Sequence, residues 1–164
     1  MNSVDYKLAT TYGGIVGRLA RLLLGLRWNH VLIVEWIDDQ PCTTYESNLR
    51  GVHRHPFDAQ RDLAWEHEWY EATEPFSAME LAAFQGYCEG ACGKWYALHI
   101  WPLLAWRALR RPRAVGLIPA ETCVTFVNAA CALVGRPVSQ GGAEGLPDDI
   151  MQSAHWTRME RVRR

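Results

Sequence analysis

The sequence predicts an α+β fold in which a small antiparallel β-sheet packs against helices. Two β-prone runs flank a turn-forming tetrapeptide at residues 38–41, and the clearest helical patterns follow later in the chain. The 164 residues, of which 49% are hydrophobic, have the length of one domain that spans 1–164 and buries a substantial core. The balance of 17 Lys and Arg against 18 Asp and Glu argues against a general nucleic-acid binder.

The first half of the chain contains mostly strand patterns. An amphipathic helix is expected over about residues 14–27, and its docking on the core is favoured over a position on a membrane surface. Residues 29–37 and 42–47 are predicted to pair as a hairpin around the turn, and a short third strand is expected near 51–54. Interleaved aromatic and acidic residues at 65–70 are compatible with another strand.

The second half contains helix signals with recognisable ends. Ser77 and Glu80 form a capping box that predicts a helix over residues 78–88, which glycines then end. The last clear helix is expected over 119–134, where a glycine and a proline stop it. The basic tail at 158–164 is expected to fray. Shorter helical patterns occur at 98–109 and 146–151.

The cysteine count and the N-terminal sequence bear on the compartment. Five cysteines cannot all pair within one chain. The first eight residues lack the basic-then-apolar order of a signal peptide, and no apolar run reaches the length of a membrane span. We therefore expect synthesis in the cytoplasm, which is compatible with a phage-encoded or otherwise delivered protein and with peripheral membrane or cell-wall contact. The oligomeric state stays open.

A cysteine near the start of a helix is a candidate nucleophile, because unpaired N–H groups and the helix dipole stabilise a thiolate there. Cys123 has this position in the last predicted helix. A thiolate also needs a base and a group that orients the base. His30 begins the first β-prone run, and Glu46 falls almost opposite His30 if the hairpin centres near residues 38 and 39. Glu35 lies five residues along the same strand and therefore faces the other way.

Five stretches, in order, then match a known pattern. They are residues 28–34 (WNHVLIV), 45–47 with 51–52 (YES, GV), 93–96 (GKWY), 121–127 (ETCVTFV) and 146–150 (LPDDI). With these stretches the chain resembles the circularly permuted NlpC-like branch of the papain-fold cysteine hydrolases. That branch contains YiiX-like proteins and relatives of lecithin retinol acyltransferase. The chain departs from many relatives after the cysteine, where Val124 and Thr125 replace a serine or glutamate.

The resemblance implies a single permuted papain-like domain that performs acyl transfer without a cofactor. It assigns Cys123 as the nucleophile, His30 as general base and then acid, and Glu46 as the orienting group. The backbone N–H of Cys123 would be one oxyanion donor. Four aromatic residues are candidates for substrate binding, with core packing as the alternative: Trp28, Tyr45, Trp95 and Tyr96.

Three functions stay open at this point. The first is hydrolysis of an amide or peptide bond, most plausibly in a cell-wall peptide. The second is acyl transfer on a lipid ester or amide, which the aromatic and basic region at 95–113 favours. The third is a structural or assembly module, such as a phage tail component, that keeps the fold without turnover.

Two patterns invite a metal interpretation, and both are weak. Cys88, Cys92 and His99 have wide spacing for zinc and lack a fourth ligand. His53 and His55 lie on one face of an extended segment, but no acidic or thiol residue lies close to them in the sequence. A solvated loop is the preferred interpretation of that pair, so no metal site is predicted.

Overall fold

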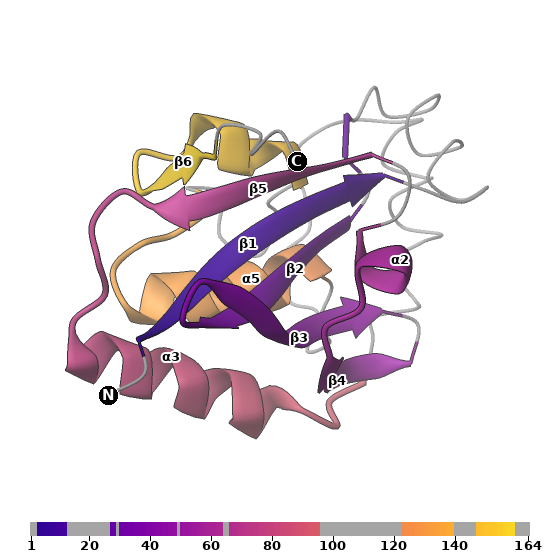
Figure 1. Ribbon diagram of the computed structural model, residues 1–164, viewed down its shortest axis with the longest axis horizontal. Coiled ribbons are helices and arrows are strands. Elements are labelled where there is room, and N and C mark those ends of the chain that lie inside the picture. Colours follow the sequence, from indigo (N-terminus) through magenta and orange to yellow (C-terminus); the bar gives the residue numbers. More distant parts are fainter. Residues whose placement is uncertain are drawn as a thin grey trace, which may run out of the picture.

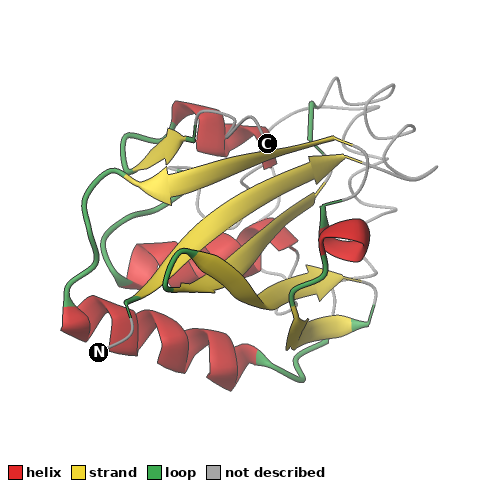
Figure 2. Ribbon diagram, viewed as in Figure 1, coloured by secondary structure: helices red, strands yellow, loops and turns green. Residues whose placement is uncertain are grey.

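A six-stranded antiparallel sheet forms the centre of the protein and confirms the α+β class (Figures 1 and 2). The computed structural model describes residues 3–12, 27–28, 30–48, 50–63, 66–95, 123–139 and 147–159. The strands, in the spatial order β4-β3-β2-β1-β5-β6, are β1 (Val4–Tyr12), β2 (His30–Ile37), β3 (Gln40–Asn48), β4 (Gly51–Pro56), β5 (Glu66–Ala72) and β6 (Trp156–Arg158). The helices are α2 (Ala59–Asp62), α3 (Ala78–Ala91), α5 (Cys123–Leu133) and the 3₁₀ helix η2 (Pro147–Gln152).

The predicted hairpin is confirmed as β2 and β3. Its turn consists of Asp38 and Asp39, whose φ angles are 50° and 60°. Two positive φ angles are typical of the type I′ turn, whose twist matches that of the paired strands. Gln40 pairs with Ile37, so the turn is shorter than the predicted tetrapeptide. The predicted third strand is also confirmed, as β4.

The strand at the centre of the sheet was not predicted from the sequence. β1 pairs with β2 on one side and with β5 on the other, so both of its edges are covered. Seven of its nine residues are buried, including Lys7 and two threonines. The Lys7 ammonium lies 4.1 Å from the centroid of the Trp36 ring, a cation–π contact that compensates for its burial. The polar residues of β1 thus concealed in the sequence a strand that is mostly buried.

The two faces of the sheet bury different clusters. α3 and α5 cover one face, where Phe84, Phe126 and Val127 pack with Tyr6 and Ile33 of the sheet in the larger core (Figure 1). The opposite face carries a smaller cluster of Ala9, Leu32, Val34 and Leu63, the residue that follows α2. Alternation along β2 therefore divides its apolar residues between two cores.

The helix starting at the capping box is confirmed as α3. The Ser77 hydroxyl accepts from the Glu80 N–H at 3.3 Å, and the Glu80 carboxylate accepts from the Ser77 N–H at 2.7 Å. The C-terminal part of the last predicted helix is confirmed as α5. The predicted helix at 98–109 lies outside the described residues, and so does the one at 14–27 apart from Arg27.

The prediction of a frayed tail from residue 158 is wrong at its first residue. Arg158 ends β6 and pairs with Tyr70 of β5, and its side chain forms an ion pair with Glu68. Cross-strand pairing fixes this basic residue, whereas composition alone favoured fraying. No helix among the described residues is both long and apolar enough to cross a membrane.

The end of α3 leads back to the outer edge of β4. The Val52 N–H donates to the Lys94 carbonyl at 2.9 Å, and the Gly93 N–H donates to the Val52 carbonyl at 2.8 Å. Gly51 has a φ of +94°, and a Cβ atom there would collide with the Lys94 carbonyl. Only glycine fits this close approach. Residues 51–52 and 93–94, which belong to two stretches of the family-like pattern, are therefore in contact here.

Candidate active site

The thiol of Cys123 lies at the first residue of α5, at the end of the sheet where β2 begins. Its residue surface is only 6% exposed. Burial by itself raises the pKa of this thiol, but the contact with the His30 ring and the backbone N–H groups of Val31 and Val124 outweigh it. The net effect is a pKa below that of an ordinary cysteine. Cys123 thus has the electrostatic environment of a reactive thiolate.

The ring of His30 lies between the thiol and a carboxylate. Its Nε2 atom is 3.0 Å from Oε2 of Glu46, which leaves Nδ1 as the ring nitrogen available to the Cys123 thiol. Burial lowers the pKa of His30, but the interactions with Cys123 and Glu46 outweigh it and raise the pKa to about 10. A lowered pKa of the thiol together with a raised pKa of the imidazole is typical of a thiolate–imidazolium pair.

The carboxylate of Glu46 is held ionised by its neighbours. Its side chain is 16% exposed. Burial raises the pKa of Glu46, but the hydrogen bond with His30 and the nearby rings of His55 and His53 lower it to about 2. The structure therefore brings together the three predicted residues, Cys123, His30 and Glu46. Glu35 instead accepts a hydrogen bond from the Tyr6 hydroxyl at 3.4 Å, on the opposite face as expected.

A β-bulge determines on which face of the sheet the Glu46 side chain lies. Ile37 pairs with Gln40 at the turn, but the register shifts by one residue between Glu35 and Trp36, so that Ile33 pairs with Tyr45. Without the shift, Glu46 would stand opposite Val31 and would point toward α5 and the larger core. With it, Glu46 shares the face of His30, diagonally across the two strands.

Two further histidines lie beside the same carboxylate, a contact that was not predicted from the sequence. The prediction of a loop around His53 and His55 is wrong, because both lie on β4. His53 is the register partner of Glu46, and the Nε2 atoms of His53 and His55 lie 3.2 and 3.1 Å from Glu46 Oε1. The acidic neighbour that the sequence lacked comes from the adjacent strand. Following the hairpin register into 51–56 would have revealed it.

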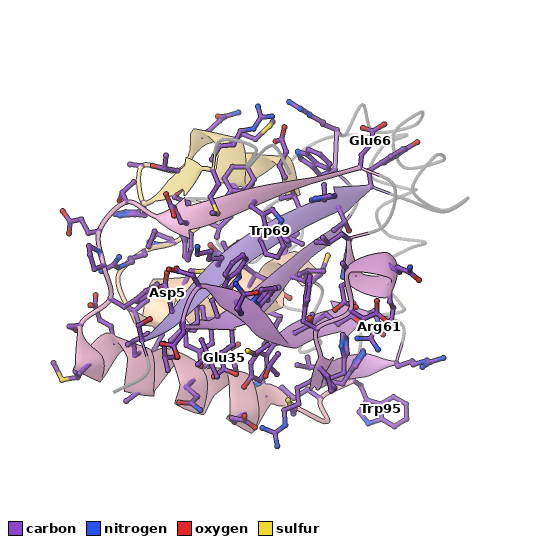
Figure 3. All side chains as sticks on the ribbon, viewed as in Figure 1. Asp5, Glu35, Arg61, Glu66, Trp69 and Trp95 are labelled. Carbon is purple, nitrogen blue, oxygen red and sulfur yellow. The ribbon has the colours of Figure 1, made fainter. Side chains whose placement is uncertain are left out.

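A buried carboxylate on α2 supports this cluster from behind. Asp62 accepts from the Thr44 hydroxyl at 2.7 Å, from the Asp58 N–H at 3.0 Å and from Arg61 Nε at 2.7 Å. Burial raises the pKa of Asp62, but these donors outweigh it, and the pKa lies below its ordinary value. Arg61 belongs to α2, and its side chain, labelled below that helix in Figure 3, also contacts His55 at Nδ1. The network fixes α2 against the strands that carry the cluster.

The four aromatic candidates for substrate binding differ in exposure. Trp28 and Tyr45 are 2% and 1% exposed, so their rings are buried and not open to a substrate. The Tyr45 hydroxyl donates to Glu89 at 2.8 Å. Trp95 is 86% exposed and extends away from the body of the protein beside β4 (Figure 3). Tyr96 lies outside the described residues.

The other four cysteines have different environments. Cys88 and Cys131 are fully buried, and burial raises the pKa of both thiols. Cys92 is half-buried, and burial raises its pKa as well. Cys42 is half-buried at the bulge of β3, and its thiol contacts the Gln40 carbonyl at 3.4 Å. The pKa of Cys123 is therefore shifted in the opposite direction to those of Cys88, Cys92 and Cys131.

Two comparisons with known proteins add no relative. A scan against protein-family models finds no match for the chain, and a search of curated proteins finds none either. The case for a function therefore depends on the site itself.

Proposed function

We propose that the protein is a cysteine-dependent hydrolase that cleaves an amide or peptide bond through a thioester. One observation carries the proposal: the His30 ring contacts the Cys123 thiol and has its Nε2 atom 3.0 Å from Glu46. A nucleophile, a base and a group that orients the base are the elements that thiol catalysis needs. The lowered pKa of the thiol and the raised pKa of His30 agree with these roles.

The proposed reaction starts from the thiolate–imidazolium pair. The Cys123 sulfur attacks the carbonyl carbon, and the backbone N–H of Cys123 donates to the oxyanion. The C–N bond then breaks while His30 gives its proton to the leaving amine, which leaves a thioester on the sulfur. Water attacks the thioester as His30 takes up a proton, and the carboxylic acid is released. Glu46 holds the ring in the orientation that serves both steps.

The arrangement of the site also supports the proposed family. In the permuted papain-like pattern, the histidine strand precedes the nucleophile helix in the sequence. Here His30 begins β2, Glu46 lies on the neighbouring β3, and Cys123 follows much later at the start of α5. A helix that packs against an antiparallel sheet with its first residue at the strand ends is the arrangement that the resemblance implies. We propose membership of the NlpC-like branch on these grounds.

The first experiment asks whether Cys123 is selectively activated. Iodoacetamide at neutral pH should label Cys123 before the other four cysteines, and His30→Ala and Glu46→Gln should slow the labelling. Cys42→Ala is the matched control, because Cys42 lies on the same hairpin without contact to the His30 ring. Equal labelling of all five cysteines would contradict the proposal and favour an inert assembly module.

The second experiment identifies the bond that is cleaved. Purified protein should hydrolyse cell-wall peptides, and Cys123→Ala should abolish the activity. Phospholipid vesicles and lipid amides form the parallel arm, which the exposed ring of Trp95 makes worthwhile. Turnover of lipids alone would replace the peptide substrate by a lipid and retain the thioester mechanism.

A further inference from the structure

The cluster of Glu46, His53 and His55 contains more ligand atoms than the orientation of His30 requires. Glu46 uses Oε2 for His30 and directs Oε1 at the other two rings. The side chains of His53 and His55 are 31% and 14% exposed, so the cluster is partly buried but accessible from the edge strand β4. The second carboxylate oxygen of Glu46 therefore faces two rings that have no role in the proposed thiol mechanism.

We propose that Glu46, His53 and His55 form a binding site for Zn²⁺ or a similar first-row divalent metal. Two imidazole nitrogens and one carboxylate oxygen are a ligand set that suits these metals, whereas Ca²⁺ and Mg²⁺ prefer oxygen ligands alone. Three protein ligands leave one tetrahedral position for water.

The distances fit such a site. His53 Nε2 and His55 Nε2 lie 3.2 and 3.1 Å from Glu46 Oε1, and all three ligand atoms lie within 4.8 Å of one another. Metal–ligand bonds of about 2.1 Å in a tetrahedron separate the ligand atoms by roughly 3.4 Å. Two edges of the tetrahedron are thus already close to that length, and small ring rotations bring the third into range.

Backbone carbonyls select the ring nitrogens that face the cluster. His53 Nδ1 lies 3.0 Å from the Gly51 carbonyl, and His55 Nδ1 lies 3.1 Å from the Pro56 carbonyl. An Nδ1–H that donates to a carbonyl leaves the Nε2 lone pair for a metal, which is the usual outer arrangement of zinc-bound histidine. With both rings in that form, two lone pairs and a carboxylate oxygen face one another, and a cation between them removes the repulsion.

Arg61 is the competing group. Its guanidinium contacts His55 Nδ1 and would, as a donor there, hold the ring in the opposite tautomer. The same guanidinium has alternative acceptors, since it donates to Asp62 at 2.7 Å and to the Pro56 carbonyl at 2.6 Å. Metal binding therefore requires only that Arg61 keep those two partners and release His55. Arg61→Gln should consequently strengthen metal binding.

The strand geometry makes the site local. His53 and His55 are two residues apart on one strand and so lie on one face, and Glu46 is the direct cross-strand partner of His53. Metal binding therefore needs no change in the register of β3 and β4.

The test is calorimetric titration of the full chain with Zn²⁺ after chelator treatment, using Cys123→Ser so that the thiol cannot bind the metal. We expect one bound ion per chain, and His53→Ala or His55→Ala should weaken binding about tenfold or more, since even supporting residues contribute that much. His155→Ala is the matched control and should leave binding unchanged. Co²⁺ should give a spectrum without a sulfur-to-metal charge-transfer band.

Three outcomes would overturn the proposal. They are the absence of binding, binding unaffected by both histidine substitutions, and a sulfur-to-cobalt band from the remaining cysteines. Because the titration uses a variant without the nucleophile, its result does not depend on the proposed hydrolase activity. Failure of that activity, seen in the turnover assay, would leave the metal site standing.

Discussion

The substitution Cys123→Ser tests whether Cys123 and His30 form a thiolate–imidazolium pair. A serine hydroxyl is uncharged at neutral pH and nearly the same size as a thiol, so the substitution removes the negative charge beside His30 and little else. We expect the pKa of His30 to fall in this variant. Glu46, at 3.0 Å from the ring, remains in contact with it in this variant.

The magnitude follows from the environment of the ring. His30 has a pKa of about 10 against an ordinary value of 6.5, which corresponds to about 5 kcal/mol of preference for the charged ring. Burial opposes this preference, while Cys123 and Glu46 together create it. Removing one opposite charge in contact lowers a pKa by about 1–3. The ring of the serine variant should therefore lose its proton at a correspondingly lower pH.

Carbon-detected or proton-detected NMR of the histidine rings across pH 5–11 in the presence of a chelator measures this directly. The chain has six histidines, and the five others serve as internal references. Cys42→Ser is the control and should leave the titration of His30 unchanged. The reasoning would be refuted if His30 already titrated near its ordinary value in the unaltered protein, or if Cys123→Ser left its pKa where it was.

Three further changes test the support of the site. Gly51→Ala should destabilise the fold by roughly 1–3 kcal/mol in urea unfolding, because φ is +94° and the Lys94 carbonyl occupies the space of a Cβ. Asp62→Asn should cost about 1–3 kcal/mol at pH 7. Because the folded-state pKa of Asp62 is lowered, its ionisation stabilises the protein above the ordinary value of 3.8, and the difference between variant and parent should shrink as the pH falls below that value. Deleting Cys42 should remove the bulge and leave a regular ladder in which Tyr45 still pairs with Ile33, so Glu46 keeps the face of His30. Alkylation of the nucleophile should therefore stay at the rate of the parent protein, while circular dichroism shows a folded protein.

Local signals in the sequence predicted the parts of the fold that short-range chemistry determines. The Asp38–Asp39 turn, the alternation around it and the capping box at Ser77 each depend on residues within a few positions. The pairing of His30 with Glu46 was predictable because a hairpin brings its own strands together. The contact with Cys123 spans 93 positions: the sequence named both residues as candidates, but no local signal determined that they meet, and the family pattern only implied it.

The parts that were missed depend on partners distant in the sequence. β1 looks unlike a buried strand because Lys7 and its threonines are polar, and their compensating contacts come from β2 and β5. His53 and His55 lacked an acidic neighbour in the sequence, and the register of β3 against β4 supplied Glu46. A partner on a neighbouring strand cannot be predicted from composition, because the order and register of the strands determine which residues meet.

The bulge in β3 shows why even the correct prediction needed one more step. A two-residue turn with an unbroken ladder places Glu46 opposite Val31, on the face of α5, and leaves His30 without an orienting carboxylate on its own face. Pro41, which pairs with Trp36, has no N–H to give to a ladder, and the register shifts directly beyond it. The proline after the turn is therefore a sequence signal for the shift. A one-residue shift exchanges the two faces of a strand. Pro41 and the extra residue Cys42, directly after the turn, therefore decide that Glu46 lies on the same face as His30.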